Sequence, residues 1–405
     1  MTKAKDYAII TGIKKRGSAK MADNKTDELY QTAKNYFVKQ DYAEAIKHFQ
    51  EAADLGSAEA QFALGFIYHH VNHSGNSEPD YKQAAFWYAK AIEQGYATAM
   101  ANMGSLYELG NGVPQSYSKA YALYLRGAEL GDQFAQCNLA NCYLLGKGVE
   151  NDPQQAAKYY RLSAEQGNVT AQYNLGCCLY DAKEGLADKA QALIWLEKAA
   201  AGGVAEAATF LGYHYAQNGT PDCDWAKAVA WYKKAAEQNN KTAQCNLALC
   251  YTHGLGVTKD VKKAFELYSK AASEGSDLAE YVLGEWYAQG FYVQRNDKAA
   301  FEHFMRAAQY GDEDALKAVG LCYEKGLGVE PNHKEALFWL LQAAPKLEPD
   351  ALFELGLAYI NGDEGLPTDR AAAAFWLRQA ISKGHEEAKL VLKQLFKEAY
   401  TNYLK

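Results

Sequence analysis

The feature that most constrains the fold is a repeat of 36 residues that runs through most of the chain. Nine small residues recur at intervals of 36 after one first step of 39, and nine alanines keep the interval of 36 without exception. Chance does not place two such rows in one chain, so each repeat is one structural unit that stacks on its neighbours. The small-residue row consists of Gly65, Gly104, Ala140, Gly176, Gly212, Ala248, Gly284, Gly320 and Gly356, and the alanine row of Ala84, Ala120, Ala156, Ala192, Ala228, Ala264, Ala300, Ala336 and Ala372.

Each repeat is predicted to be a pair of helices. In a unit such as 139–167, apolar and small residues recur at spacings of three and four in two blocks, which is the periodicity of a helix. Turn sequences such as "GNGVP" and "GLGVTKD" separate the blocks, and most units end on a glycine suited to a left-handed cap. All eight prolines are expected in connections. The chain is therefore predicted to be all-α, a right-handed α-solenoid of about ten antiparallel helix hairpins.

The chain divides into four segments. Residues 1–27 are predicted to be a flexible basic leader, since 1–25 hold seven basic and two acidic residues. Residues 28–56 have the spacings of a tetratricopeptide hairpin, and 57–384 hold nine repeats. Residues 385–405 are predicted to form a capping helix, with Lys389, Lys393, Lys397 and Glu398 facing water.

Small and large residues divide the predicted core between them. The two rows of small residues are expected where the helices of a hairpin cross and their backbones come close. Rings are expected to fill the layer between hairpins, at the positions three after the alanine row, such as Trp87 and Trp195, and three after the small-residue row, such as Tyr107 and Tyr251.

The repeats resemble the Sel1-like repeat, a relative of the tetratricopeptide repeat. The segment "AQCNLALCYTHGLGVTKDVKKAFELYSKAASEG" is similar to the family pattern AxxxLGxxYxxGxGVxxDxxKAxxWYxxAA, as are the units that begin "AQFALGFIY", "AQCNLANCY" and "AQYNLGCCL". The resemblance covers 57–384. It implies an α-solenoid that binds other proteins, commonly as a scaffold or adaptor in signalling, quality control or contact between bacteria and host. It implies no active site.

Composition limits the classes of partner and the cellular locations that we expect for this chain. The net charge of −7 argues against nucleic-acid binding, which needs clustered lysine and arginine. The sequence lacks an apolar run of about 18 residues and a secretory signal, so we expect no membrane insertion and a cytoplasmic location.

Few residues suggest chemistry. His69 and His73 could share a helix face and bind a metal, but a third ligand is not evident and a solvated loop edge is the alternative. The regular cysteine pairs found in some secreted relatives are absent, so the eight cysteines are expected to be reduced and partly buried. The sequence shows no phosphate-binding loop and no nucleophile motif, and we expect no cofactor and no catalytic residue.

Similarity to tetratricopeptide solenoids places partner binding on the concave face lined by the first helix of each hairpin. The positions three before, one after and four after the small-residue row are expected to line it, with Tyr173, Tyr213 and Tyr281 as anchors for an extended or helical apolar segment. The alternative is that these residues pack against the next repeat. A carboxylate clamp is not expected, because only Asn141 and Lys317 suit one. The candidate residues are Phe62, Phe66, Asn141, Tyr173, Tyr213, Leu249, Tyr281, Leu321 and Phe353.

The expected function is that of a non-enzymatic scaffold or adaptor that binds a partner protein or peptide. Two alternatives stay open. One is an immunity or antitoxin protein that sequesters a cognate effector, and the other is a metal- or nucleotide-dependent enzyme.

Overall fold

The computed structural model describes residues 23–70, 79–180, 187–343, 349–362 and 368–403. These residues form 21 helices, and no strand occurs among them. The chain divides into two compact units, residues 1–207 and 208–405. His73 lies outside the described residues, as does the predicted leader up to residue 22.

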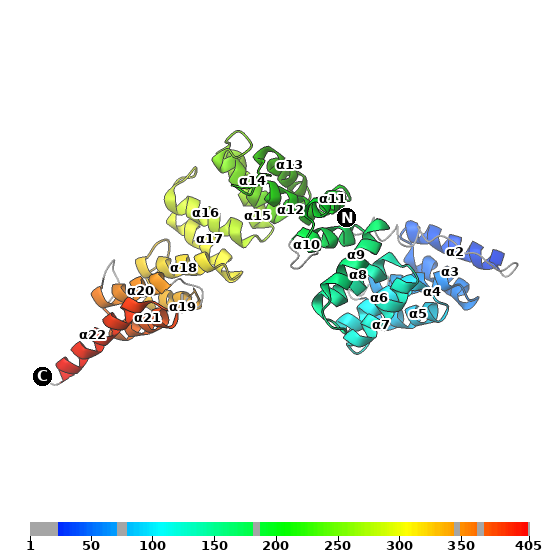
Figure 1. Cartoon of the computed structure of the whole chain (residues 1–405), viewed down its shortest axis with the longest axis horizontal. Coiled ribbons are helices and arrows are strands. Elements are labelled where there is room, and N and C mark those ends of the chain that lie inside the picture. The colour runs from blue at the N-terminus through cyan, green and yellow to red at the C-terminus, as the bar shows by residue number, and fades with distance from the viewer. Residues whose placement is uncertain (1–22, 71–78, 181–186, 344–348, 363–367, 404–405) are drawn as a thin grey trace. The chain divides into compact units, whose positions relative to one another are not determined.

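The first unit is built from hairpins of similar length (Figure 1). Its helices are α2 (Asp23–Val38), α3 (Tyr42–Asp54), α4 (Ala58–His70), α5 (Tyr81–Glu93), α6 (Ala97–Leu109), α7 (Tyr117–Glu129), α8 (Gln133–Leu145), α9 (Pro153–Glu165), α10 (Val169–Tyr180) and α11 (Lys189–Ala201), followed by the start of α12 (Ala205–Tyr215).

The second unit contains most of α12 and continues the same pattern. Its other helices are α13 (Trp225–Ala236), α14 (Lys241–His253), α15 (Val261–Ser273), α16 (Asp277–Gln289), α17 (Asp297–Gln309), α18 (Glu313–Lys325), α19 (His333–Ala343), α20 (Pro349–Asn361), α21 (Arg370–Ser382) and α22 (Glu386–Tyr403).

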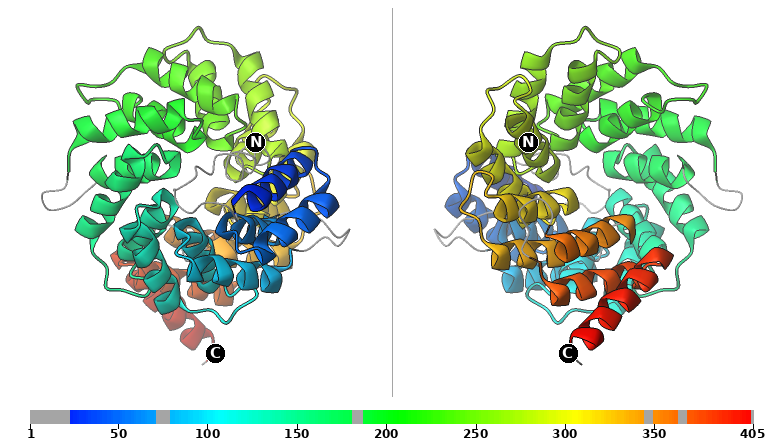
Figure 2. Two further views of the ribbon diagram at one scale, coloured as in Figure 1. Left: turned by 90° about the vertical axis from the view of Figure 1, so that its right-hand side faces the viewer. Right: turned by 90° about the vertical axis from the view of Figure 1, so that its left-hand side faces the viewer.

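Consecutive helices pair into hairpins, α2 with α3, α4 with α5, and so on to α20 with α21. Within each unit neighbouring hairpins lie side by side (Figure 2). The prediction of about ten hairpins followed by one further helix is confirmed. Two prolines depart from the prediction that all eight lie in connections, because Pro153 and Pro349 begin helices. The first turn tolerates proline, since its backbone N–H has no partner inside the helix.

The short connection between hairpins follows from the residues at Gly131 and Asp132. Gly131 has a φ of +84° and donates its N–H to the carbonyl of Ala128, while the N–H of Asp132 bonds to the carbonyl of Gly127. These two bonds end α7 in a Schellman motif. The Asp132 side chain then accepts the N–H of Ala135, 2.8 Å away, which begins α8. One residue therefore ends one helix and starts the next.

The core lies where the two helices of a hairpin cross, as predicted. A Cβ added to Gly65 would come within 2.5 Å of the Tyr88 ring, and one added to Gly284 within 2.6 Å of the Phe304 ring. The alanine row is buried on the facing helix. The large side chain that fills this crossing stands four residues after the alanine row. The sequence analysis predicted core rings one position earlier, three residues after that row. These side chains are Tyr88, Tyr124, Tyr160, Leu196, Tyr232, Tyr268, Phe304 and Leu340, whereas in the last repeat Leu377 faces Gly356.

The predicted ring positions are only partly core. Trp87 and Trp195 are buried, whereas most tyrosines three after the small-residue row are half-buried at the edge of the hairpin. The ammonium of Lys119 lies 5.2 Å from the ring centre of Tyr107 and that of Lys263 lies 5.5 Å from that of Tyr251. These rings keep one face toward a cation and water, which suits the amphipathic character of tyrosine.

Buried glutamines connect neighbouring hairpins. Gln136 in α8 donates its side-chain N–H to the carbonyl of Ala128 in the preceding hairpin, 3.4 Å away, and accepts a bond of 2.8 Å from Gln166. Gln61 repeats the arrangement with Ala53 and Gln94. A buried carboxamide has to be hydrogen-bonded, so these residues fix how one hairpin sits on the next.

The last helix is less polar than predicted. Lys389, Lys393 and Lys397 are exposed, as expected, and Glu398 lies outside the described side chains. Leu390 is 71% exposed and Phe396 is 49% exposed on the same helix. Both are apolar residues at positions where an earlier helix of the array would contact its next neighbour.

Candidate functional site: the first-helix face

One side of most first helices is left uncovered by its neighbours. It consists of the positions six before, two before, one after and five after the small-residue row, which share a helix face because they are spaced by four, three and four. We call this the first-helix face. Six of its large apolar side chains are between 39% and 62% exposed: Leu109, Phe134, Leu145, Tyr213, Leu249 and Leu278.

The residues predicted three before the small-residue row lie elsewhere. Phe62 is fully buried and its ring stacks on Tyr96 with 5.0 Å between centres, and Phe353 is buried and stacks on His385 at 4.2 Å. Tyr96 and His385 begin the neighbouring hairpin or helix. This row therefore packs against the next repeat, the alternative considered above, and Phe62 and Phe353 have no surface to offer a partner.

Tyr173 and Tyr281 belong to the same row and are half-buried. The Tyr281 ring lies 5.7 Å from that of Phe304 in the core of its own hairpin. These two tyrosines contribute to packing, and each presents only part of its surface.

The residues one after the small-residue row are exposed or half-buried at most positions of the first-helix face. Tyr213 and Leu249 are 57% and 42% exposed, and Asn141 and Leu321 are half-buried. Phe66 is the exception, since it is buried against His70 with 4.5 Å between ring centres. Whether any of these residues contacts a partner stays a prediction.

On α6, α8 and α10, three of the four positions of the first-helix face carry no charged side chain. The positions six before, two before and one after the small-residue row hold hydroxyl, carboxamide, aromatic or thiol side chains on α6, α8 and α10. They are Thr98, Asn102, Ser105, Phe134, Asn138, Asn141, Thr170, Asn174 and Cys177.

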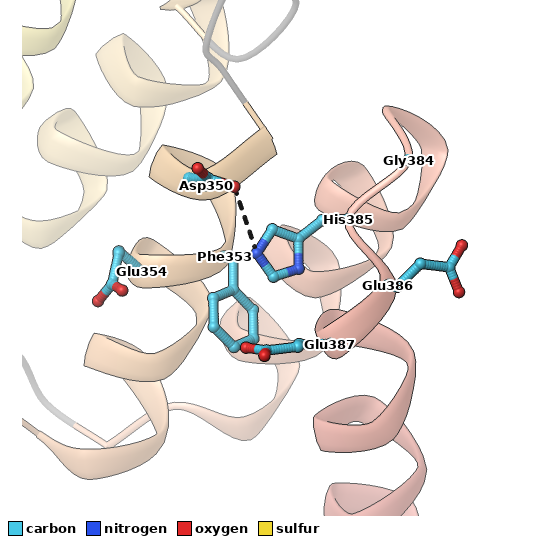
Figure 3. A pocket seen from close by; sticks show the side chains of 7 residues that line it. All are labelled: Asp350, Phe353, Glu354, Gly384, His385, Glu386 and Glu387. Carbon is cyan, nitrogen blue, oxygen red and sulfur yellow. Dashed lines mark ion pairs between the residues drawn. The ribbon is translucent and has the colours of Figure 1, made fainter.

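In the second unit the same face becomes acidic toward α20. An open hollow of about 580 Å³ lies between the start of α20 and the start of α22 (Figure 3). His385 Nδ1 accepts the N–H of Ala388, so Nε2 carries the proton and lies 3.5 Å from the Asp350 carboxylate. The hollow is lined by Asp350, Phe353, Glu354, Gly384, His385, Glu386 and Glu387.

Histidine and cysteine side chains are the candidates for chemistry among the described residues. Among the described residues there is no cluster of three histidine, cysteine or acidic side chains that could hold a metal ion. His69 Nδ1 lies 3.3 Å from the Tyr88 hydroxyl, and burial and the neighbouring His70 lower the pKa of His69 to about 3. All eight cysteines lie among the described residues, and none of them is in a disulfide. Burial raises the pKa of Cys137 to about 12 and of Cys250 to about 11, so these thiols are poor nucleophiles near neutral pH.

None of the described helices combines the length and the apolar character that a bilayer span requires.

Comparison with known proteins decides the family. A model of the Sel1 repeat matches ten stretches of the chain: 19–57, 58–96, 97–132, 133–168, 169–204, 205–240, 241–276, 277–312, 314–344 and 349–385. The chain belongs to the Sel1 repeat family. Proteins of this kind are generally protein-interaction scaffolds, and they are typically not enzymes.

Solved structures agree with this assignment. A protective antigen of uropathogenic Escherichia coli with an SLR fold is 30% identical, covers 87% of this chain and 83% of its own, and gives a TM-score of 0.60. A Sel1 repeat protein from Oxalobacter formigenes is 30% identical over 61% of this chain and 100% of its own, with a TM-score of 0.56.

A third solved structure is less similar to this chain. An immunity protein from Pseudomonas aeruginosa is 20% identical over 51% of this chain and 80% of its own, with a TM-score of 0.37, which gives no argument about function. No significant match was found among curated proteins.

The Sel1 repeats contain a signal for the first-helix face that our sequence analysis did not use. The motifs "AQCNL" and "AQYNL" place an asparagine two before the small-residue row, at Asn138, Asn174 and Asn246, and "MANMG" does the same at Asn102. A polar residue inside an otherwise apolar motif marks the side of the Sel1 helix that faces away from the core.

Proposed function

We propose that this Sel1 repeat protein is a non-enzymatic scaffold or adaptor that holds a partner protein against its first-helix face. The observation that carries the proposal is the set of exposed apolar side chains on that face. Single exposed apolar residues are common on any protein, but a row repeated along neighbouring elements is typical of a contact surface.

In the second unit the anchors of the proposed surface are Tyr213 on α12 and Leu249 on α14. They occupy the same position in consecutive repeats, so they lie on adjacent first helices. Tyrosine is enriched among the residues that dominate binding energy, because it buries a large ring and keeps a polar end. The partner is proposed to be a protein, since the net charge of −7 opposes a nucleic acid.

Site-specific cross-linking tests this proposal. A photo-reactive phenylalanine analogue at position 213 is expected to capture a defined partner in the native cell. The matched control is position 310, whose tyrosine is 63% exposed, slightly more than Tyr213, but follows the second helix α17 and lies off the face. Position 310 is expected to give no such product.

The variant Tyr213→Ala with Leu249→Ala is expected to reduce recovery of that partner at least tenfold, which corresponds to about 1.4 kcal/mol or more of binding free energy. Its helical content should match the parent, because both side chains are exposed. Equal cross-linking at 213 and 310, or full recovery by the double variant, would contradict the proposal.

A further inference from the structure

Helix α22 lies at the end of the second unit and packs on one side against α21 (Figure 1). Ala388 and Leu395 are buried in the core that the two helices share, and Val391 and Leu392 pack beside them. On the opposite side Leu390 is 71% exposed, more than any other large apolar side chain among the described residues. Single exposed leucines are common, so the residues on the same side of α22 decide how this one is interpreted.

Four residues share the outer side of α22, because they are spaced by four, three and four. They are Glu386, Leu390, Lys393 and Lys397, and each is exposed. We call these four residues the α22 stripe. Figure 3 shows the Glu386 side chain pointing away from α20, toward this outer side. The stripe is thus acidic at its start, apolar in the middle and basic at its end.

Further carboxylates make the start of the stripe more acidic. Glu354 and Glu387 line the hollow beside it, and neither has an ion-pair partner among the described residues. Glu386 lies 2.6 Å from Lys389, but both side chains are more than half exposed, so this pair contributes little and can exchange partners. At about 0.1 M salt a cation is attracted to this end of the helix from about 10 Å away.

The order of charges fits a second copy of the same helix that runs in the opposite direction. In that arrangement Glu386 of each copy faces Lys397 of the other, and Leu390 faces the aliphatic stem of Lys393. The two-fold axis passes midway between positions 386 and 397. Every favourable contact then occurs twice, as in the isologous interface of a two-fold dimer. A parallel pair would place like charges together.

The contact between the two helices is small. The stripe runs from residue 386 to residue 397, which is about 18 Å of helix, and this buries less than the roughly 1,200–2,000 Å² of a stable interface. Phe396 adds little apolar surface, because the Arg378 guanidinium lies 5.6 Å from its ring centre and covers part of it. The pairing is therefore expected to be weak, reversible and sensitive to salt.

We propose that two copies of this chain pair through the α22 stripe, antiparallel and related by a two-fold axis. Leu390 lies near the centre of the pair, and Glu386 with Lys397 of the second copy closes each end. A second copy is the occupant because one surface supplies both halves of the match in charge. The inference concerns α22 alone and goes beyond the proposed function, on which it does not depend.

Sedimentation velocity of the full chain tests the pairing. Between about 1 µM and about 100 µM protein, at about 0.1 M salt, the chain is expected to shift from monomer toward dimer. At about 1 M salt the Debye length shortens from about 10 Å to about 3 Å. The dissociation constant of the dimer should then rise about tenfold.

A variant in the middle of the stripe separates this interface from any other. Leu390→Asp places a carboxylate at the centre of the pair and is expected to weaken the dimer at least about tenfold. Its helical content should match the parent, because Leu390 is exposed. The matched control is Leu55→Asp, since Leu55 is 53% exposed but follows α3 in the first unit. This control should sediment as the parent does.

Charge reversal tests the antiparallel orientation. Glu386→Lys alone or Lys397→Glu alone places like charges at both ends of the pair, so each should weaken the dimer several-fold. The double variant with both changes restores opposite charges at both ends and should regain most of the parent affinity. This rescue occurs only if positions 386 and 397 of different copies face each other.

A parent chain that stays monomeric at the highest concentration would overturn the inference, as would a dimer that Leu390→Asp leaves intact. A double charge variant as weak as the single variants would overturn the antiparallel arrangement. A photo-reactive residue at position 390 that captures a different protein, while the parent chain stays monomeric, would assign the stripe to that protein instead. Cross-linking at position 213 is a separate measurement, so either proposal can fail without the other.

Discussion

At the residue scale, the turn between α8 and α9 depends on Gly148, because a side chain there would force its neighbours to shift. Gly148 has a φ of +76°, and a Cβ there would collide with the backbone carbonyl of Tyr117 at the start of α7. The equivalent turn between α16 and α17 holds Tyr292 at a φ of +62°, and its ring lies 5.5 Å from that of Phe265. There the ring contact offsets some of the backbone strain.

Gly148→Ala is therefore predicted to cost about 2–4 kcal/mol of unfolding free energy, from a left-handed backbone and an overpacked contact together. The matched control is Gly131→Ala, whose φ of +84° is similar but whose Cβ would meet nothing within 4 Å. It should cost only about 1 kcal/mol. Urea-unfolding midpoints followed by circular dichroism measure both. Equal costs would mean that the close approach at Gly148 does not matter.

His69 gives a pH dependence with a defined sign. Burial and His70 lower its pKa to about 3 in the folded chain, against an ordinary value of 6.5. The unfolded chain then binds more protons between these values, so the contribution of His69 to stability is complete above pH 6.5 and is lost as the pH falls toward 3. At pH 5 the loss is about 2 kcal/mol.

The measurement is the unfolding midpoint at pH 7 and at pH 5 for the parent and for His69→Gln. The parent should lose more stability than the variant between these two values, because glutamine does not titrate. If the two chains lose the same amount, His69 does not have the lowered pKa.

At the element scale, the sequence predicted helices and hairpins well but not which helix side stays uncovered. Period, glycine caps and capping residues such as Asp132 are local, so they can be read from the chain. The rotation of one hairpin on the next is set by contacts between repeats, such as Phe62 on Tyr96. For this reason Phe62 and Phe353, which were predicted to line an open surface, are buried, whereas Tyr213 and Leu249 are exposed.

The buried glutamines allow a test of whether contacts between repeats set how one hairpin sits on the next. Gln136→Met keeps the volume of the side chain but removes its bonds to Ala128 and Gln166, and should cost about 1 kcal/mol. Gln154→Met, on the exposed side of α9, is the control and should change the unfolding midpoint little. A Gln136 variant as stable as the control would show that packing alone positions neighbouring hairpins.

At the scale of the whole molecule, the repeat of 36 residues determines how the chain is stabilised and which kind of surface it offers. Each hairpin buries its apolar side only against its neighbours, so stability grows along the array without one central core. A site that depends on residues from distant parts of a chain has no obvious place in such an array. A surface that repeats every 36 residues does, and the first-helix face is the surface that we propose. The repeat period and the crossing of small residues in the core could be predicted from the sequence, whereas the identity of the partner could not.

The most direct test of this account is hydrogen–deuterium exchange of the full chain, alone and with the partner captured through position 213. The account predicts slower exchange at first helices, α12 and α14 above all, and unchanged exchange at the second helices α13 and α15. Protection confined to second helices, or the same exchange with and without the partner, would contradict it.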